Sequence, residues 1–408
     1  MEQKLPDRCR VAVIGGGVIG ASVAWHLTRL GCSDVLVLER GQLGCGTTWH
    51  SAGNILRMSA DPRTISIYTY GVELLSGLHE RNDIGWRQCG RVMIARTEQR
   101  AREFETIRRT LEDHGVPIDA IPNSVVAQKL PVLNTEDIVG ALWSPDDGRV
   151  NPTDLVAAYV REAKQRGAQV HEGVTVSHAL TADGRVTGVS TDRGDVLCET
   201  VVNCTGLWAR DLGLRNDVAL PLYPVEHFYL LTGEIDGVYA DMPTFRDPDG
   251  LIYGREEVGG LLLGCFDRDA IPVRPADLPE PFYFALLNEN WDQFMPYLQE
   301  GVHRVPALEH AGVRMLLNGP EAFTPDAAPL LDEAPELKNY FVLAGLSSAG
   351  VTRSAGMGRA LANWIVEGEP GMDVSSFSLA RFDRASNDEA HLRQAVRHAP
   401  SGHFDVES

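Results

Sequence analysis

The chain has 408 residues, of which 44% are hydrophobic and 23% charged, a composition typical of a soluble globular protein and a length that predicts two domains. A formal net charge of −19 argues against nucleic acid as a partner, because a phosphate backbone needs a basic surface. No apolar run approaches the roughly 20 residues that span a bilayer, and residues 1–10 lack the apolar core of a signal peptide. We therefore expect no membrane insertion and a cytoplasmic location.

The first element expected in the chain is a strand over residues 11–14, which leads directly into the glycine-rich run 15–20 and then a helical pattern. Each of three glycines has a use in a turn that binds a dinucleotide. Gly15 allows the tight turn, Gly17 lets a pyrophosphate approach the backbone, and Gly20 permits close packing of the helix on the strand. A glycine-rich loop without a ligand is the alternative, and the strand and helix around this motif disfavour it.

A second apolar strand over residues 35–38 ends at Glu39, the acidic position that accepts hydrogen bonds from ribose hydroxyls. The segment 40–54 that follows is long, polar and rich in small residues. Such a loop suits a ligand that continues from the pyrophosphate to a flavin ring. The sequence therefore predicts FAD rather than NAD.

Segments typical of a nucleotide-binding domain recur at three places in the chain. A helix over residues 155–166 precedes strands at 169–176 and 200–206, and a further strand over 340–345 precedes a helix at 354–366. Between them, residues 221–317 alternate in polarity, are rich in aromatic side chains and contain prolines, which predicts an antiparallel sheet. The tail from Arg381 onward is polar and is expected to be peripheral.

The seven cysteines form no C-x-x-C pair, and most lie in apolar, strand-like contexts. They indicate reduced, buried thiols, with neither a disulfide framework nor a metal site. Cys45 lies in the predicted flavin loop, where we interpret it as a packing residue.

The run Gly44-Cys45-Gly46-Thr47-Thr48-Trp49-His50-Ser51-Ala52-Gly53-Asn54 resembles the segment of dimethylglycine and sarcosine dehydrogenases in which a histidine is bonded covalently to the flavin. The resemblance covers nearly the whole chain, because further family motifs follow in the family's order at 144–152, 202–209, 224–227, 318–326 and 345–350.

This resemblance implies an α/β fold like that of D-amino-acid oxidase. A Rossmann-like FAD-binding domain, of the D-amino-acid oxidase and glutathione reductase type, is expected from residues 1–90, 142–220 and 318–380. A substrate domain with a mixed antiparallel sheet is expected from residues 91–141 and 221–317, followed by a C-terminal tail, 381–408.

The resemblance further implies oxidation of a secondary or tertiary N-methyl amine or amino acid, such as dimethylglycine or sarcosine. Hydride passes to flavin N5, and the iminium hydrolyses to the demethylated amine and formaldehyde. His50 is the expected site of covalent FAD attachment, and His227 and Tyr253 are the expected catalytic residues near the substrate. The alternatives are a hydrogen-bonding loop histidine at position 50 and ordinary core residues at 227 and 253.

The other expected FAD contacts are Gly15, Gly17, Gly20, Glu39, Arg40, Thr47, Thr48, Ala52, Val174, Gly206, Gly319, Gly345, Gly350 and Thr352. Arg57 and Arg353 are candidates for binding a substrate carboxylate, since a guanidinium matches it with two parallel hydrogen bonds. A structural salt bridge is the alternative for both arginines. No metal is expected.

Two departures from related enzymes narrow the prediction. Monomeric sarcosine oxidases carry a flavin-linked cysteine near Gly319 and an oxygen-activating lysine near Thr352, and this chain has neither. Their absence favours attachment at His50 and a dehydrogenase, with an electron-transfer flavoprotein or oxygen as acceptor. The folate-binding domain of the larger dimethylglycine dehydrogenases has no counterpart in this sequence, so we expect formaldehyde to be released or passed to a separate protein.

Two other functions remain open. One is a deaminating amino-acid oxidase of the glycine oxidase kind, which would release ammonia rather than formaldehyde. The other is a flavin-bearing regulatory subunit, because a regulatory subunit of pyruvate dehydrogenase phosphatase shares this fold. Retention of His50, His227 and Tyr253 argues against a regulator.

Overall fold

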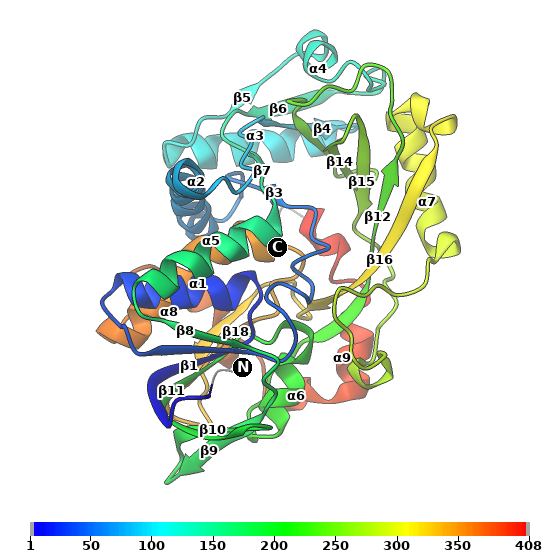
Figure 1. Cartoon of the computed structure of the whole chain (residues 1–408). Coiled ribbons are helices and arrows are strands. Elements are labelled where there is room, and N and C mark those ends of the chain that lie inside the picture. Colours follow the sequence, from blue (N-terminus) through cyan, green and yellow to red (C-terminus); the bar gives the residue numbers. More distant parts are fainter. Residues whose placement is uncertain (1–3, 405–408) are drawn as a thin grey trace.

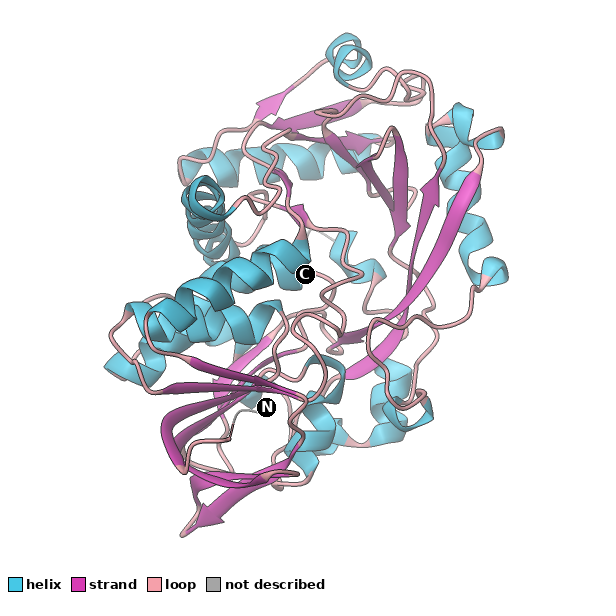
Figure 2. Ribbon diagram, in the orientation of Figure 1, coloured by secondary structure: helices cyan, strands magenta, loops and turns pink. Residues whose placement is uncertain are grey.

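The computed structural model describes residues 4–404, so residues 1–3 of the first expected segment and 405–408 of the expected tail lie outside the described residues. Two large sheets organise the chain (Figure 1). Figure 2 shows one sheet in the lower part of the view and the other at the upper right, with helices between and around them. The predicted α/β class is confirmed.

The first sheet is built on parallel strands from three separate parts of the sequence. These are β1 (Arg8–Ile14), β2 (Val35–Glu39), β8 (Gln169–Glu172), β11 (Gly194–Asn203) and β18 (Tyr340–Ala344). The antiparallel strands β17 (Leu330–Glu333), β9 (Val176–Ala182) and β10 (Arg185–Thr191) complete it. The order β17-β18-β11-β1-β2-β8 places β1 between β11 and β2, so the glycine-rich turn after β1 lies at the middle of one sheet edge.

Both faces of β1 are covered. Val11 and Val13 pack against a layer of three helices, α1 (Val18–Arg29), α5 (Pro152–Gln165) and α8 (Gly350–Glu367). Ala12 and Ile14 point to the opposite face, where the β9–β10 hairpin and α6 (Ala209–Leu214) lie. A strand buried on both sides needs apolar residues at every position, which explains the uninterrupted apolar run in the sequence.

The second sheet has the order β16-β12-β15-β14-β13-β4-β6-β5. Its strands are β4 (Arg91–Ala95), β5 (Asp119–Ala120), β6 (Gly140–Ser144), β12 (Tyr223–Thr232), β13 (Thr244–Asp247), β14 (Ile252–Glu257), β15 (Gly260–Cys265) and β16 (Val313–Phe323). Neighbours are antiparallel except β13 and β4, which are parallel. The helices α3 (Glu98–Asp113), α4 (Asn123–Lys129) and α7 (Trp291–Arg304) pack on this sheet.

The remaining elements connect these layers. α2 (Pro62–Asn82) packs on α8, and the short strands β3 (Asn54–Ile55) and β7 (Gly148–Arg149) form a separate pair. Within residues 4–404 no helix is both long and apolar enough to cross a bilayer.

Two of the expected domain boundaries fall inside strands. Residue 142 lies within β6 and residue 318 within β16, and both strands belong to the second sheet. The reason is that β16 pairs with β12 along its whole length, from Val313 to Phe323. The second sheet therefore extends beyond the expected boundaries, to residue 144 in β6 and to residue 323 in β16.

The expectation of a peripheral tail was wrong for the described part of it. In α9 (Glu389–Ala395) and just beyond, Leu392 and Val396 are completely buried against Tyr223 and Phe323. Residues 401–404 form a short 3-10 turn that brings His403 into a cavity beside the second sheet. A few apolar residues at helical spacing were enough to dock this otherwise polar segment.

Candidate active site

A cavity of about 310 Å³ opens at the carboxyl ends of β1, β2 and β11. Gly15 there has φ +106°, and a Cβ at this position would lie 2.5 Å from the carbonyl oxygen of Cys204. A Cβ on Gly20 would lie 1.9 Å from the Gly15 carbonyl oxygen. The tight turn and the close packing of α1 on β1 thus both require glycine, as the sequence indicated.

The first turn of α1 presents backbone amides to this cavity. Gly17 is the N-cap and supplies no side chain to bond them, while the Thr48 hydroxyl accepts from the Val18 amide at 3.1 Å. Helix N-termini of this kind bind phosphate, because free N–H groups and the helix dipole both favour negative charge. The turn therefore fits the pyrophosphate of a dinucleotide.

Glu39 lies at the end of β2 and lines the same cavity. Its carboxylate accepts hydrogen bonds from the amides of Gly16 and Gly41, both at 2.7 Å. An ionised carboxylate has further acceptor positions for ribose hydroxyls. Beside it, the Arg40 guanidinium lies 3.5 Å from the centre of the Trp208 ring. These residues fit the nucleotide half of FAD.

Several other expected FAD contacts line this smaller cavity. They are Thr47, Thr48, Val174, Gly206, Gly345 and Gly350. Cys45 also lines it, and burial followed by the neighbouring Glu39 charge raises the pKa of its thiol to about 11. All seven cysteines are free, and among residues 4–404 no cluster of His, Cys, Asp or Glu is suited to a metal ion.

A larger cavity of about 440 Å³ lies between this region and the second sheet. Ser51, Glu321, Ser348 and Val351 line both cavities, so the two adjoin. The loop at the junction is strained, since Ser347 and Ser348 have φ of +49° and +59°, a conformation that concentrates at functional sites. A ligand as long as FAD can thus extend from the glycine turn to the start of the larger cavity.

His50 lines the larger cavity near this junction and is 4% exposed. Burial lowers the pKa of its imidazole to about 4, with the Glu321 carboxylate opposing the shift and His227 adding to it. The ring packs on Gly319, which lines neither cavity. The glycine therefore makes room for His50, a role that the sequence did not reveal.

His227 on β12 and Tyr253 on β14 line the same larger cavity. Burial lowers the pKa of His227 to about 4, so its ring is neutral at neutral pH. Its Nε2 lies 3.1 Å from the Ser348 hydroxyl, while its buried Nδ1 has no hydrogen-bond partner. Burial also raises the pKa of the Tyr253 phenol, so it stays protonated as a potential donor. The structure thus brings His50, His227 and Tyr253 to one cavity.

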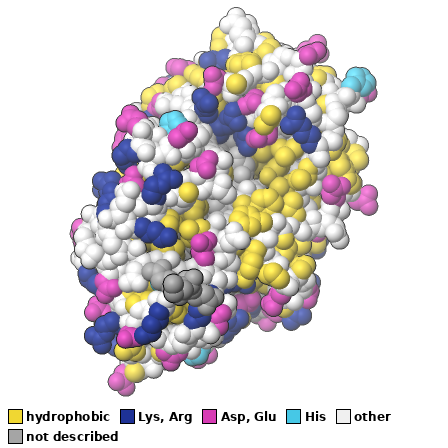
Figure 3. All heavy atoms as spheres, viewed as in Figure 1, with side chains coloured by type: hydrophobic (Ala, Val, Ile, Leu, Met, Phe, Trp, Pro, Cys, Tyr) yellow, Lys and Arg dark blue, Asp and Glu magenta, His cyan; other side chains and the backbone are white. Residues whose placement is uncertain are grey.

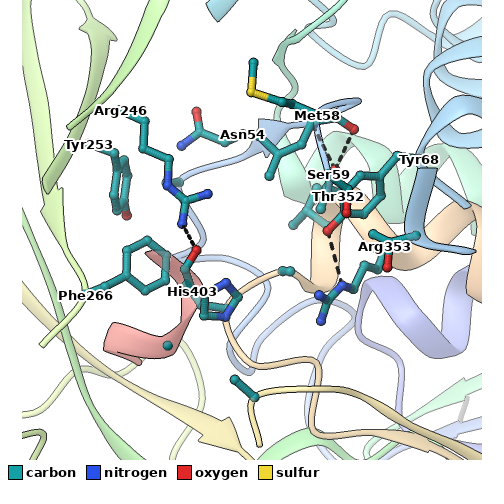
Figure 4. Close-up of a pocket in the computed structure, with 18 of the residues that line it drawn as sticks. Asn54, Met58, Ser59, Tyr68, Arg246, Tyr253, Phe266, Thr352, Arg353 and His403 are labelled. Atoms are coloured by element: carbon teal, nitrogen blue, oxygen red, sulfur yellow. Dashed lines mark hydrogen bonds between the residues drawn. The ribbon is translucent and has the colours of Figure 1, made fainter. Parts of the chain in front are cut away.

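The two arginine candidates have different positions. Arg353 lines the larger cavity and donates to the Tyr68 hydroxyl at 3.3 Å (Figure 4). It also donates to the Leu346 carbonyl at 3.3 Å. Arg57 is not part of the cavity wall, and its guanidinium forms an ion pair with Asp146. The expectation that Arg57 binds a substrate carboxylate is corrected accordingly, because its charge is already matched by a structural partner.

Ala52 and Thr352 also line the larger cavity. The Ala52 carbonyl accepts from Arg255 Nε at 2.8 Å, and the Thr352 hydroxyl accepts from the Leu56 amide at 2.9 Å. Both residues therefore hold the loop that follows His50 in place.

Several wall residues were missed by the sequence analysis, namely Arg91, Arg246, Phe266, Glu321 and His403. Figure 4 shows Arg246, Tyr253, Phe266 and His403 grouped on one side of the cavity and Arg353 on the other. Glu321 had a signal, since it lies inside the quoted motif 318–326. The others come from segments with no motif.

The nucleotide-binding turn, the acidic residue on the next strand and the adjoining second cavity define a dinucleotide-binding protein with space for a substrate at one end of the ligand. The family model described as FAD dependent oxidoreductase matches residues 10–364, and the chain belongs to this family.

Curated relatives include proteins with different roles. The chain is 37% identical to 4-methylaminobutanoate oxidase (formaldehyde-forming) of Paenarthrobacter nicotinovorans, over 96% of this chain and 48% of the relative. It is also 37% identical to the mitochondrial pyruvate dehydrogenase phosphatase regulatory subunit of Mus musculus, over 96% of this chain and 45% of the relative. Mitochondrial sarcosine dehydrogenase of Mus musculus is 34% identical, over 99% of this chain and 45% of the relative. The chain thus spans less than half the length of these three relatives.

Among solved structures, L-proline dehydrogenase from P. horikoshii has a TM-score of 0.83 at 23% identity, covering 93% of this chain and 99% of that one. This likeness supports the fold alone.

Proposed function

We propose that this protein oxidises a secondary or tertiary N-methyl amine or amino acid, such as dimethylglycine or sarcosine, and releases formaldehyde from its N-methyl group. The observation that carries the proposal is the junction of the two cavities, where His50, His227 and Tyr253 face one space. Bound FAD would supply the hydride acceptor, flavin N5. Gly15, Gly17, Glu39 and Thr48 would hold its nucleotide half.

The chain's own residues bind and orient the amine. Hydride leaves a carbon next to nitrogen only when the nitrogen lone pair is free, so the amine must lose its proton before oxidation. The arginines of the cavity wall disfavour an ammonium ion, because like charges repel. The Tyr253 hydroxyl can donate a hydrogen bond that fixes the orientation of a bound amine or carboxylate.

We further propose that FAD is attached covalently through His50. Burial keeps this imidazole unprotonated at neutral pH, so that a ring nitrogen lone pair is available. The test is denaturation in acid, because yellow colour released wholly into the supernatant would contradict attachment. A His50→Ala protein should release all of its flavin under the same conditions.

Monomeric sarcosine oxidases carry a lysine near Thr352 that promotes reaction with oxygen, and its absence from this sequence favours a dehydrogenase. The acceptor we propose is an electron-transfer flavoprotein, with slow reoxidation by oxygen. Comparing the reoxidation rate in air with the rate in the presence of a redox dye tests this point.

A regulatory role is the second candidate, because one relative at 37% identity is a phosphatase regulatory subunit. The decisive experiment is anaerobic reduction of the yellow protein by a panel of N-methyl amino acids and amines. Rapid loss of the flavin band with formaldehyde formed would support the oxidoreductase. Ammonia without formaldehyde would favour a deaminating oxidase. No reduction by any compound, with dithionite still effective, would favour the regulatory role.

A further inference from the structure

Arginines dominate the charge of the larger cavity, although the whole chain carries −19. Five arginines and three carboxylates line it, namely Arg63, Arg91, Arg100, Arg246, Arg353, Asp61, Glu321 and Asp326. Several of these charges are already paired: Asp61 with Arg63 at 3.0 Å, Asp326 with Arg381 at 2.7 Å, and Arg100 with Glu103 at 2.7 Å and with Asp249 at 3.3 Å. The wall holds three further arginines, Arg91, Arg246 and Arg353, and one further carboxylate, Glu321. The cavity therefore suits an anionic ligand.

Arg91 and Arg246 lie on adjacent strands and face this cavity together. In the parallel pair β13–β4, Arg246 is opposite Met93 and Thr244 is opposite Arg91. Residues two apart on a strand share a face, so all four side chains point to one side of the sheet. Arg91, Met93 and Arg246 all line the cavity.

One N–H donor group of the buried Arg91 guanidinium lacks a hydrogen-bond acceptor. Its side chain is 4% exposed, Nε donates to the Thr244 hydroxyl at 3.1 Å, and Nε also lies 3.3 Å from Asp147. Its buried Nη2 has no hydrogen-bond partner. A buried guanidinium N–H without an acceptor is costly, and a carboxylate oxygen from a ligand would satisfy it.

Arg246 donates from Nη2 to the carbonyl oxygen of His403 at 2.7 Å, as Figure 4 shows. Burial, followed by the Arg91 charge, lowers the pKa of Arg246 to about 9. The strand register and the shared cavity wall place the two cations on one face of the sheet. Two neighbouring buried cations are stabilised by an anion that both can reach.

The sheet also fixes how far this pair lies from the proposed site of oxidation. Arg246 is directly opposite Tyr253 in the β13–β14 register. His227 lies on β12, three strand positions from β13 in the sheet order. At ~4.8 Å between strands, that is roughly 14 Å of backbone separation. The side chains come closer than the backbones, because the centre of the Phe266 ring lies 5.2 Å from that of His227 and 5.4 Å from Arg246 Cζ.

We propose that Arg91 and Arg246 form a subsite for the carboxylate of an N-methyl amino acid whose carboxylate and nitrogen are separated by several bonds. This inference rests on the proposed function and names its substrate class. The amine lies near His227 on β12, and the chain extends across the sheet face past Tyr253 toward β13 and β4. Sarcosine, with one carbon between nitrogen and carboxylate, spans less of this face than a longer chain does.

The test compares three substrates in steady-state assays of the holoprotein: sarcosine, 4-methylaminobutanoate, and N-methylbutylamine, which has the same chain without the carboxylate. We expect 4-methylaminobutanoate to have the highest kcat/KM. Arg246→Gln should raise the KM for 4-methylaminobutanoate on the order of 10- to 100-fold and leave that for N-methylbutylamine nearly unchanged. Arg246→Lys should restore part of the loss.

The control is Arg109→Gln, an exposed arginine of α3 whose pair with Glu105 lies on the surface. Because Arg91→Gln leaves Asp147 buried without its partner, Arg91→Lys is the safer second variant and should also raise the KM for the carboxylate. Equal losses for both long substrates, a loss on Arg353→Gln but not on Arg246→Gln, or a higher kcat/KM for sarcosine would each overturn the proposal.

A binding measurement separates this subsite from the proposed reaction. Butanoate should bind the holoprotein in calorimetry and bind Arg246→Gln at least about 10-fold more weakly, whether or not any amine is oxidised. Absence of oxidation with butanoate binding intact would contradict the proposed function alone. Equal binding to both proteins, or no binding to either, would overturn the subsite.

Discussion

The imidazole of His50 lies so close to Gly319 that a Cβ on the glycine would come within 2.5 Å of ring atoms Cε1 and Nδ1. Gly319 is opposite His227 in the β12–β16 pairing. One glycine on the second sheet therefore sets the position of a loop residue that follows the nucleotide-binding strands, and it does so beside a proposed catalytic histidine.

Gly319→Ala should displace His50 and cost roughly 1–3 kcal/mol of stability through overpacking. We also expect less flavin to remain with the acid-precipitated protein. Gly312→Ala is the matched control, since no atom lies within 4 Å of its added Cβ. Unfolding in urea and the colour of the acid pellet report the two effects, and equal behaviour of both variants would contradict the role of Gly319.

Gly20→Ala should abolish the nucleotide-binding turn, because its Cβ would overlap the Gly15 carbonyl oxygen at 1.9 Å. The expected result is protein purified without yellow colour and destabilised by about 3 kcal/mol. Gly77→Ala in α2 is the control, since its nearest contact is an ordinary 3.6 Å from Arg81. That change should be neutral or stabilising by up to about 1 kcal/mol. Normal flavin content in Gly20→Ala would refute the prediction.

The buried histidines predict a pH dependence of stability. His227 has a folded-state pKa of about 4, below its ordinary 6.5, so between these values the unfolded chain binds a proton that the folded chain does not. The contribution of His227 to the free energy of unfolding is therefore fully present above pH 6.5, and it is lost as the pH drops toward 4.

His227→Gln removes the imidazole that takes up this proton in the unfolded chain. Its free energy of unfolding should fall less steeply than that of the unchanged protein, by about 1.4 kcal/mol per pH unit within that window. Urea unfolding of both proteins on either side of pH 6 measures the difference, and parallel pH profiles would argue against a neutral, buried His227.

Arg57→Gln should cost roughly 1 kcal/mol of stability, because the ion pair with Asp146 is only 15% and 19% exposed on its two sides. The KM for the oxidised amine should not change, since the Arg57 side chain does not line the cavity. A KM raised by tenfold or more would restore Arg57 as a substrate-binding residue.

By itself, the sequence determined the nucleotide-binding part of this protein. The apolar strand, Gly15, Gly20 and Glu39 lie within about 30 residues of each other. Their geometry follows from local chemistry, namely which residue can adopt positive φ and which can tolerate a neighbouring backbone. The contrast between apolar runs and alternating strands also separated the two sheets, because burial on one or both faces is recorded directly in the pattern.

Only the tertiary structure decided which charged groups meet in the larger cavity. Arg91 and Arg246 are 155 residues apart, and their meeting depends on the parallel register of β13 with β4, which no local pattern encodes. The same holds for His403, which reaches the cavity because Leu392 and Val396 dock on the second sheet, and for Arg57, whose partner Asp146 lies 89 residues away. Periodicity reports whether a side chain is buried, whereas long-range strand pairing selects its neighbours, and that pairing is set by packing over the whole sheet.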